Sequence, residues 1–122
     1  MIVAGFGCSS RAGAESLQAL MACVAQFARP DALACLESRA ALIAPLAQGA
    51  AVALMTFPAH AIGGIATPTQ SGRVIARFGT GSVAEACALV AAGTGPGAQI
   101  ILARVVSDDG LATCALARGA MK

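Results

Sequence analysis

Apolar residues recur along the chain in short continuous runs that alternate with segments of helical periodicity. Runs of strand length occupy 2–6, 32–36, 51–57, 99–106 and 111–117, and helical spacing occurs over 14–28, 40–47 and 82–92. Short apolar runs that alternate with helices are typical of an α/β protein with a parallel sheet. The pattern therefore predicts one three-layer α/β domain over residues 1–122, with a mainly parallel sheet flanked by helices.

Local turn and cap chemistry sets two of the expected boundaries. The Asp-Asp-Gly segment at 108–110 lies between two apolar runs and predicts an antiparallel hairpin that closes one edge of the sheet. Ser82 and Glu85 have the spacing of a capping box, in which each side chain satisfies an amide at the start of a helix. That helix is expected to end across the loop 93–97.

Two further helices are predicted beside turn-rich stretches. The helix over 40–47 contains Pro45 and is expected to stop at Gly49. A second helix should begin at a cap formed by Thr67 or Thr69. It should run to Phe78, bury Val74, Ile75 and Phe78, and leave Arg73 and Arg77 facing water.

Charged residues make up only 11% of the chain and the net charge is +2, which argues against a nucleic-acid partner. No charged residue occurs from Ala40 to Gly72, but prolines and glycines interrupt this stretch. We therefore expect a buried strand with its turns there and no membrane span. No basic segment followed by a long apolar run opens the chain, so a cytoplasmic location is expected. Sparse charge and an apolar surface favour a homo-oligomer.

The five cysteines are widely and irregularly spaced, and no C-x-x-C pair occurs. With a single histidine, His60, they do not form a zinc-binding pattern, so no metal is expected. No cofactor is expected either, because the known nucleotide-binding motifs are incomplete. Four of them are interpreted as reduced, small buried hydrophobes: Cys23, Cys35, Cys87 and Cys114.

Two turns and one strand end carry groups that suit anions. The first strand is expected to stop at its glycine pair and to lead, through the turn, into a helix N-terminus. The candidate binding residues are Gly7, Cys8, Ser9, Ser10, Arg11, Gly79, Thr80, Gly81, Ser82 and Arg104. Helix N-termini attract carboxylates, and α/β sheets bind ligands at their carboxyl edge. The pattern predicts a site for a ligand with several carboxylates and a broad apolar body.

Cys8 is a candidate nucleophile, because a helix N-terminus and the nearby Arg11 would lower the pKa of its thiol. His60 is the base that could serve it. A generic nucleotide-binding domain is an alternative, although the opening segment lacks the third glycine of the dinucleotide fingerprint and no G-K-S/T follows.

Five segments of the chain resemble one known family. Three of them resemble, in the same order, the three motifs of CobE and of the CbiG C-terminal domain, which are cobalamin-biosynthesis proteins: Val3–Glu15, Pro68–Val74 and Gly79–Ala86. Leu33–Glu37 resembles the short strand between them, and Ile101–Ala117 the closing strands. The likeness spans nearly the whole chain, and the one-domain length favours the stand-alone CobE-like form.

The resemblance implies a role in corrin-ring construction. The larger family members open the lactone of cobalt-precorrin-5A, so the chain is expected to act on or bind a precorrin near that stage. A precorrin is rimmed with acetates and propionates, which suit the predicted donors. Two readings stay open: a lactone-opening enzyme in which Glu15 or Glu85 activates water, or a non-catalytic carrier or accessory subunit for the pathway's tetrapyrrole methyltransferases.

The chain departs from the family pattern at three places. Ser9 and Ser10 stand where the family usually has basic residues after the motif cysteine, and Arg11 follows them. The acidic, lysine-containing segment after the second strand is reduced to 37–39, and Arg104 takes the place of a lysine near the end of the penultimate strand. These departures affect a catalytic role more than a binding role.

Overall fold

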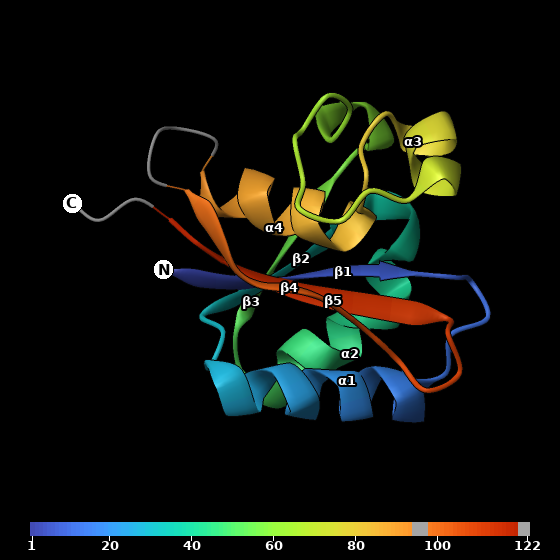
Figure 1. The fold of residues 1–122 in the computed structure, drawn as a ribbon. Helices are drawn as coiled ribbons and strands as arrows, with labels where there is room; N and C mark the ends of the chain where they lie inside the picture. Colours follow the sequence, from blue (N-terminus) through green and yellow to red (C-terminus); the bar gives the residue numbers. More distant parts are fainter. Residues whose placement is uncertain (94–97, 120–122) are drawn as a thin grey trace.

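The computed structural model describes residues 1–93 and 98–119, and in this part of the chain five strands form one sheet in the order β3-β2-β1-β5-β4 (Figure 1). The strands are β1 (Ile2–Cys8), β2 (Ala32–Leu36), β3 (Ala53–Phe57), β4 (Gln99–Val106) and β5 (Ala112–Arg118). β1, β2 and β3 are parallel, and β5 runs antiparallel to both β1 and β4. The predicted α/β fold with a closing hairpin is confirmed. The predicted loop over 93–97 lies, beyond Gly93, outside the described residues.

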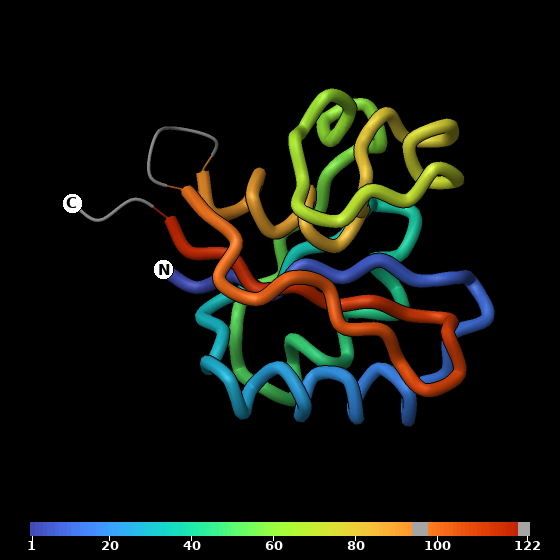
Figure 2. Tube along the Cα trace, viewed as in Figure 1, coloured from blue at the N-terminus to red at the C-terminus, as the bar shows by residue number. Residues whose placement is uncertain are grey.

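Helices cover both faces of the sheet and give the three predicted layers. They are α1 (Ala14–Phe27), α2 (Ala40–Ala50), α3 (Gly72–Phe78) and α4 (Val83–Ala92). α1 and α2 pack on one face and α4 on the other, with α3 beyond it at one end (Figures 1 and 2). α1 buries Leu17, Leu20 and Val24 as its periodicity predicts, whereas Phe27 at its last turn is 60% exposed.

Helix α4 lies directly on β1 because small residues form the contact. A Cβ at Gly5 would collide with the carbonyl oxygen of Ala84 and the backbone nitrogen of Ala88. The prediction that β1 stops at its glycine pair is wrong, since Gly7 and Cys8 still pair with β5. These glycines serve close helix–sheet packing.

Two predicted boundaries on the α2 side are also wrong. Helix α2 continues through Gly49 and is capped by Ala51, whose φ of 57° is left-handed and whose amide donates to the carbonyl of Ala47. β3 then begins at Ala53 and is a partly exposed edge strand, not a buried one. Apolar composition alone does not tell an edge strand from a central one, because the covering neighbour is distant in sequence.

Helix α3 is shorter than predicted, and neither threonine caps it. The hydroxyl of Thr67 donates to the carbonyl oxygen of Thr69 (2.8 Å), and Thr69 itself bonds Glu85. Ile75, predicted to be buried, is 43% exposed. α3 lies beyond α4 and away from the sheet, so its apolar face has less to pack against (Figure 1).

Three of the four cysteines predicted to be buried are buried: Cys35, Cys87 and Cys114. Cys23 is exposed on α1, contrary to the prediction. Its position follows Ala22 on the outer side of the helix, away from the buried face that carries Leu20 and Val24.

No single helix of the described residues is long and apolar enough to cross a membrane. α3 and α4 reach the necessary length and hydropathy only when counted together, and a 57° bend separates them. The uncharged stretch from Ala40 to Gly72 forms α2, β3 and the turns that follow.

Candidate functional site

A cleft of about 1190 Å³ opens at the carboxyl edge of the sheet. Its walls come from the segments that follow β1, β2 and β3, from α3, and from the end of the β4–β5 hairpin. These segments meet because parallel strands end at the same edge of a sheet, which is where α/β folds bind ligands. The cleft therefore lies at the edge where the sequence predicts the site, and both the turn 7–11 and Arg104 line it.

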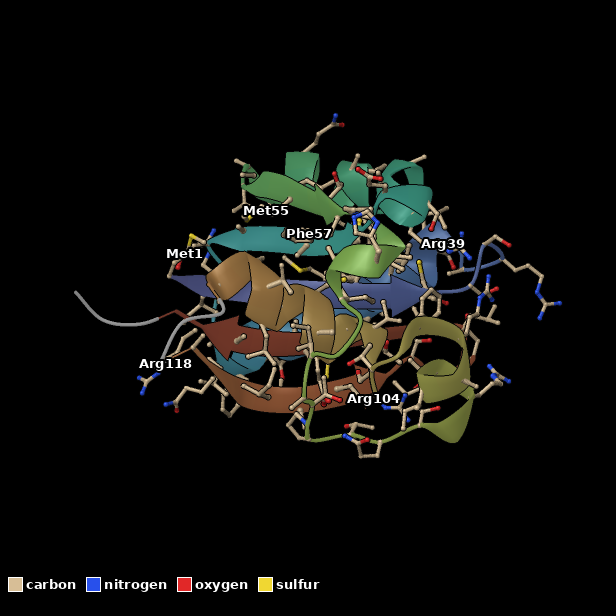
Figure 3. All side chains as sticks on the ribbon, turned by 90° about the horizontal axis from the view of Figure 1, so that it is seen from above. Met1, Arg39, Met55, Phe57, Arg104 and Arg118 are labelled. Carbon is tan, nitrogen blue, oxygen red and sulfur yellow. The ribbon has the colours of Figure 1, made fainter. Side chains whose placement is uncertain are left out.

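Arginines from five different positions in the sequence gather around this cleft. Five of the chain's eight basic residues line it: Arg11, Arg39, Arg73, Arg77 and Arg104. Glu37 is the one carboxylate among the described lining residues, so five guanidinium groups against one carboxylate give the lining a formal charge of +4. In Figure 3, Arg39 lies beside the end of β1 and Arg104 on the β4 side, whereas Arg118 lies at the opposite end of the sheet.

The cleft also offers apolar surface between these cations. Its apolar lining includes Phe6, Leu36, Val74, Phe78, Val83 and Val106. The guanidinium carbon of Arg77 lies 5.2 Å from the centre of the Phe78 ring, a cation–π distance that steadies the arginine over the apolar surface. The cleft therefore suits a ligand with an apolar body and an anionic rim.

In the turn after β1, three backbone amides donate hydrogen bonds to protein acceptors. The amide of Ser9 donates to the carbonyl of Leu111 (2.8 Å), that of Arg11 to the Ser9 hydroxyl (3.2 Å), and that of Ala12 to the Ser9 carbonyl (3.0 Å). Helix α1 begins only at Ala14. The turn is thus not the helix N-terminus that the sequence predicts. It contributes side chains to the cleft lining, and those of Ser10 and Arg11 are exposed.

Cys8 does not have the predicted reactive setting. Burial raises the pKa of its thiol, and the positive charge of Arg39 only partly opposes this. Arg39 is also bonded here, because its Nε donates to the Cys8 carbonyl oxygen at 2.7 Å. The prediction of a lowered pKa is wrong because Cys8 is the partly buried last residue of β1 and does not lie at a helix N-terminus. His60 is exposed and lies outside the cleft lining, so the two are not brought together there.

The second predicted turn lies outside the cleft lining. Thr80 is buried and its hydroxyl donates to the carbonyl of Ile65 (2.7 Å), and the buried Ser82 hydroxyl accepts an amide of the first turn of α4 (3.2 Å). Gly81 packs so closely on the backbone of the 67–71 loop that a Cβ would collide with it, and Gly79 caps α3 with a φ of 75°. These groups hold the loop that carries one wall of the cleft.

The two candidate glutamates occupy different environments. Glu85 is fully buried: its Oε1 accepts the Thr69 amide (2.9 Å), and its Oε2 accepts the Thr69 hydroxyl and the Arg104 amide (both 2.8 Å). The serine half of the capping box is confirmed, but this carboxylate bonds the loop and β4 instead of the Ser82 amide. Glu15 is exposed in the first turn of α1 and lines a separate depression of about 440 Å³.

Sequence reasoning missed three of the cleft arginines. Arg39 is the third residue after β2, so the rule that parallel strands end at one edge would have found it. Arg73 and Arg77 are four residues apart on α3 and therefore share a helix face. The prediction that both face water is confirmed, since both are exposed, but no local signal shows that this face overlooks the cleft.

The structure is thus that of an α/β domain with a cationic and partly apolar cleft at its carboxyl edge. Residues 2–117 match the family described as cobalamin synthesis G C-terminus, and the chain belongs to this family. It is a protein of the cobalamin biosynthesis pathway. The resemblance seen in the sequence is confirmed.

Solved structures of cobalamin biosynthesis proteins share this architecture. CobE, a protein from the cobalamin (vitamin B12) biosynthetic pathway, is 27% identical with a TM-score of 0.79, over 97% of this chain and 89% of its own. Cobalamin biosynthesis protein chiG from Agrobacterium tumefaciens is 28% identical with a TM-score of 0.72, over 99% and 100%. A putative cobalamin biosynthesis protein G homolog from Sulfolobus solfataricus, 19% identical over 95% and 36%, shares the fold with a TM-score of 0.68. No curated protein sequence matches the chain significantly.

Proposed function

We propose that the cleft binds a precorrin-type tetrapyrrole near the lactone-opening stage of corrin-ring formation, and that the chain carries this intermediate without hydrolysing it alone. The observation that supports the proposal most strongly is the gathering of five arginines around an apolar cleft. A guanidinium group pairs with a carboxylate through two parallel hydrogen bonds, so several arginines suit a rim of acetates and propionates.

The dimensions of the cleft support a large ligand. Its volume of about 1190 Å³ exceeds the range of roughly 300–1,000 Å³ typical of pockets for drug-sized molecules. The apolar side chains between the arginines offer contact to the methyl groups and ring edges of a macrocycle. The family's place in the cobalamin pathway supplies the chemical class of such a ligand.

The placement of the candidate catalytic groups favours a carrier. Glu85 has both carboxylate oxygens occupied by protein donors, and Glu15 lies outside the cleft. The raised pKa of Cys8 keeps its thiol protonated near neutral pH. If the cleft did contain a general base, Glu37 would be the candidate, because it is the carboxylate among the described lining residues. The pathway's tetrapyrrole methyltransferases are the proposed recipients of the ligand.

Binding is tested with an octacarboxylate porphyrin, uroporphyrin, followed by its absorbance and fluorescence. We expect saturable binding to the wild type, and weak or no binding of cyanocobalamin, whose peripheral carboxylates are amides. An Arg73→Gln/Arg77→Gln variant should bind roughly 100-fold more weakly, because removing each arginine–carboxylate pair costs about ten-fold in affinity. Arg29→Gln is the matched control, because Arg29 is exposed and lies outside the cleft lining. Equal losses in both variants would argue against the proposal.

Turnover separates the carrier from the enzyme. The purified protein is incubated with a lactone-bearing precorrin, and the lactone is followed by mass spectrometry. A carrier binds the compound and leaves the lactone intact. Ring opening that is lost in Glu37→Gln would instead identify a hydrolase with Glu37 as its base.

A further inference from the structure

Glu85 is a buried carboxylate whose hydrogen-bond partners lie outside the N-terminal cap of its own helix. It is 0% exposed, and among the described residues it is the one buried side chain of an ionisable acid or base other than cysteine. A carboxylate inside a protein is strongly unfavourable unless hydrogen bonds replace its hydration. Glu85 obtains them from three donors: the Thr69 amide, the Thr69 hydroxyl and the Arg104 amide, at 2.8–2.9 Å.

These donors belong to two separate walls of the cleft. Thr69 lies in the loop that leads to Ser71 and to α3, and thus to Arg73 in the lining. Arg104 is itself a lining residue, and its backbone amide is the one that Glu85 accepts. One carboxylate on α4 therefore joins both walls.

The strand β4 is irregular at the position of this contact. Leu102 pairs with Leu116 and Val105 with Cys114, so β4 has two residues where β5 has one. Such a bulge leaves an amide outside the ladder and redirects a side chain. The Arg104 amide bonds Glu85 at this bulge.

We propose that Glu85 is a positioning residue for the cleft, which fixes the direction of the Arg104 side chain and the placement of the α3 arginines for a polycarboxylate ligand. The inference rests on the proposed function. A carboxylate is required because the two backbone amides can only donate, and each faces a different oxygen of Glu85. A glutamine at this position would turn its NH₂ group toward the amide of either Thr69 or Arg104, and that amide would lose its acceptor.

The first test needs no ligand. Amide hydrogen exchange is measured by NMR in the wild type, in Glu85→Gln and in Ser82→Ala, which removes the α4 cap but leaves the three bonds to Glu85 intact. We expect the amide of Thr69 or Arg104 to exchange at least ten-fold faster in Glu85→Gln than the general change in stability explains, and not in Ser82→Ala. Uniform acceleration in both variants would overturn the positioning role. If Glu85→Gln does not fold, Glu85→Asp, whose side chain is one methylene shorter, should speed exchange of the Thr69 or Arg104 amide in the same way, and unchanged exchange of both amides there overturns the role equally.

The second test measures uroporphyrin affinity on three backgrounds. We expect Glu85→Gln to weaken binding about ten-fold alone, which corresponds to roughly one charge-assisted hydrogen-bonded pair. The loss should shrink on the Arg104→Gln or Arg73→Gln background, and persist on Arg11→Gln, because Arg11 lies on the turn after β1. Losses that multiply on all three backgrounds overturn the positioning role but leave the proposed function standing. If the wild type does not bind, the proposed function and the ligand role of Glu85 fail together, and the exchange experiment still decides whether Glu85 holds the two walls.

Discussion

The contact between β1 and α4 makes a strong prediction about the variant Gly5→Ala. The added Cβ would collide with the carbonyl oxygen of Ala84 and with the backbone nitrogen and Cβ of Ala88. Backbone atoms cannot rotate away, so α4 must shift from the sheet as a whole. Overpacking of a core typically costs about 1–3 kcal/mol, and two backbone collisions place this variant in the upper half, at about 2–3 kcal/mol.

This cost converts into a measurable change of melting temperature. Unfolding entropy near the midpoint is about 2.1 cal/mol/K per residue, which for this chain amounts to roughly 260 cal/mol/K. A loss of about 2–3 kcal/mol therefore lowers Tm by about 8–12 °C. The assay is thermal unfolding followed by circular dichroism, repeated with urea to obtain the free energy of unfolding.

Gly49→Ala is the matched control for this experiment. Gly49 lies exposed in α2, and an added Cβ there meets no atom within 4 Å. Alanine is favoured over glycine in a helix by about 0.5–1 kcal/mol, so this variant should melt about 2–4 °C higher than the wild type. A Gly5→Ala protein with the wild-type Tm would refute the close contact between α4 and β1.

Two further predictions concern single ionisable groups. At about pH 7.5, iodoacetamide should modify the exposed Cys23 first, because burial raises the pKa of Cys35 to about 11 and that of Cys87 to about 12. Mass spectrometry of the folded protein measures the order of modification, and buried thiols modified before Cys23 would contradict this prediction. Hydrogen bonds, the strongest from Ser107, lower the pKa of Asp109 from 3.8 to about 2. A depressed carboxyl pKa stabilises the fold above the unfolded value and loses this effect as the pH falls from about 4 to about 2. The stability difference between wild type and Asp109→Asn should therefore shrink in that window, and a difference that stays constant with pH would contradict the assignment.

Local patterns in the sequence predict most of the fold. The Asp-Asp-Gly turn is found in the hairpin, where Gly110 has a φ of 72°, and the hydroxyl of Ser82 caps α4. Both signals depend on residues that are neighbours in the chain. The errors arise where the deciding partner is distant: Gly5 is required by α4, which follows about 80 residues later. The exposure of β3 likewise depends on its place at the sheet edge.

The same distinction explains what the sequence predicts about the site. The turn after β1 and Arg104 are found at the carboxyl edge because parallel strands determine where their ends meet. The turn 79–82 faces inward because the 63–71 loop folds against it, which no short motif reveals. The sequence predicts Arg11 and Arg104 at this edge, but no local pattern shows that Arg73 and Arg77 on α3 face the same cleft.

Mapping of ¹⁵N amide shifts during a uroporphyrin titration shows whether the arginine-lined cleft receives a polycarboxylate macrocycle. Binding in the cleft predicts shifts that saturate together and concentrate in the segments 8–11, 36–39, 73–78 and 104–113, which contribute to the cleft. Shifts confined to the outer face of α1 and α2, or no saturable shift at all, would contradict it.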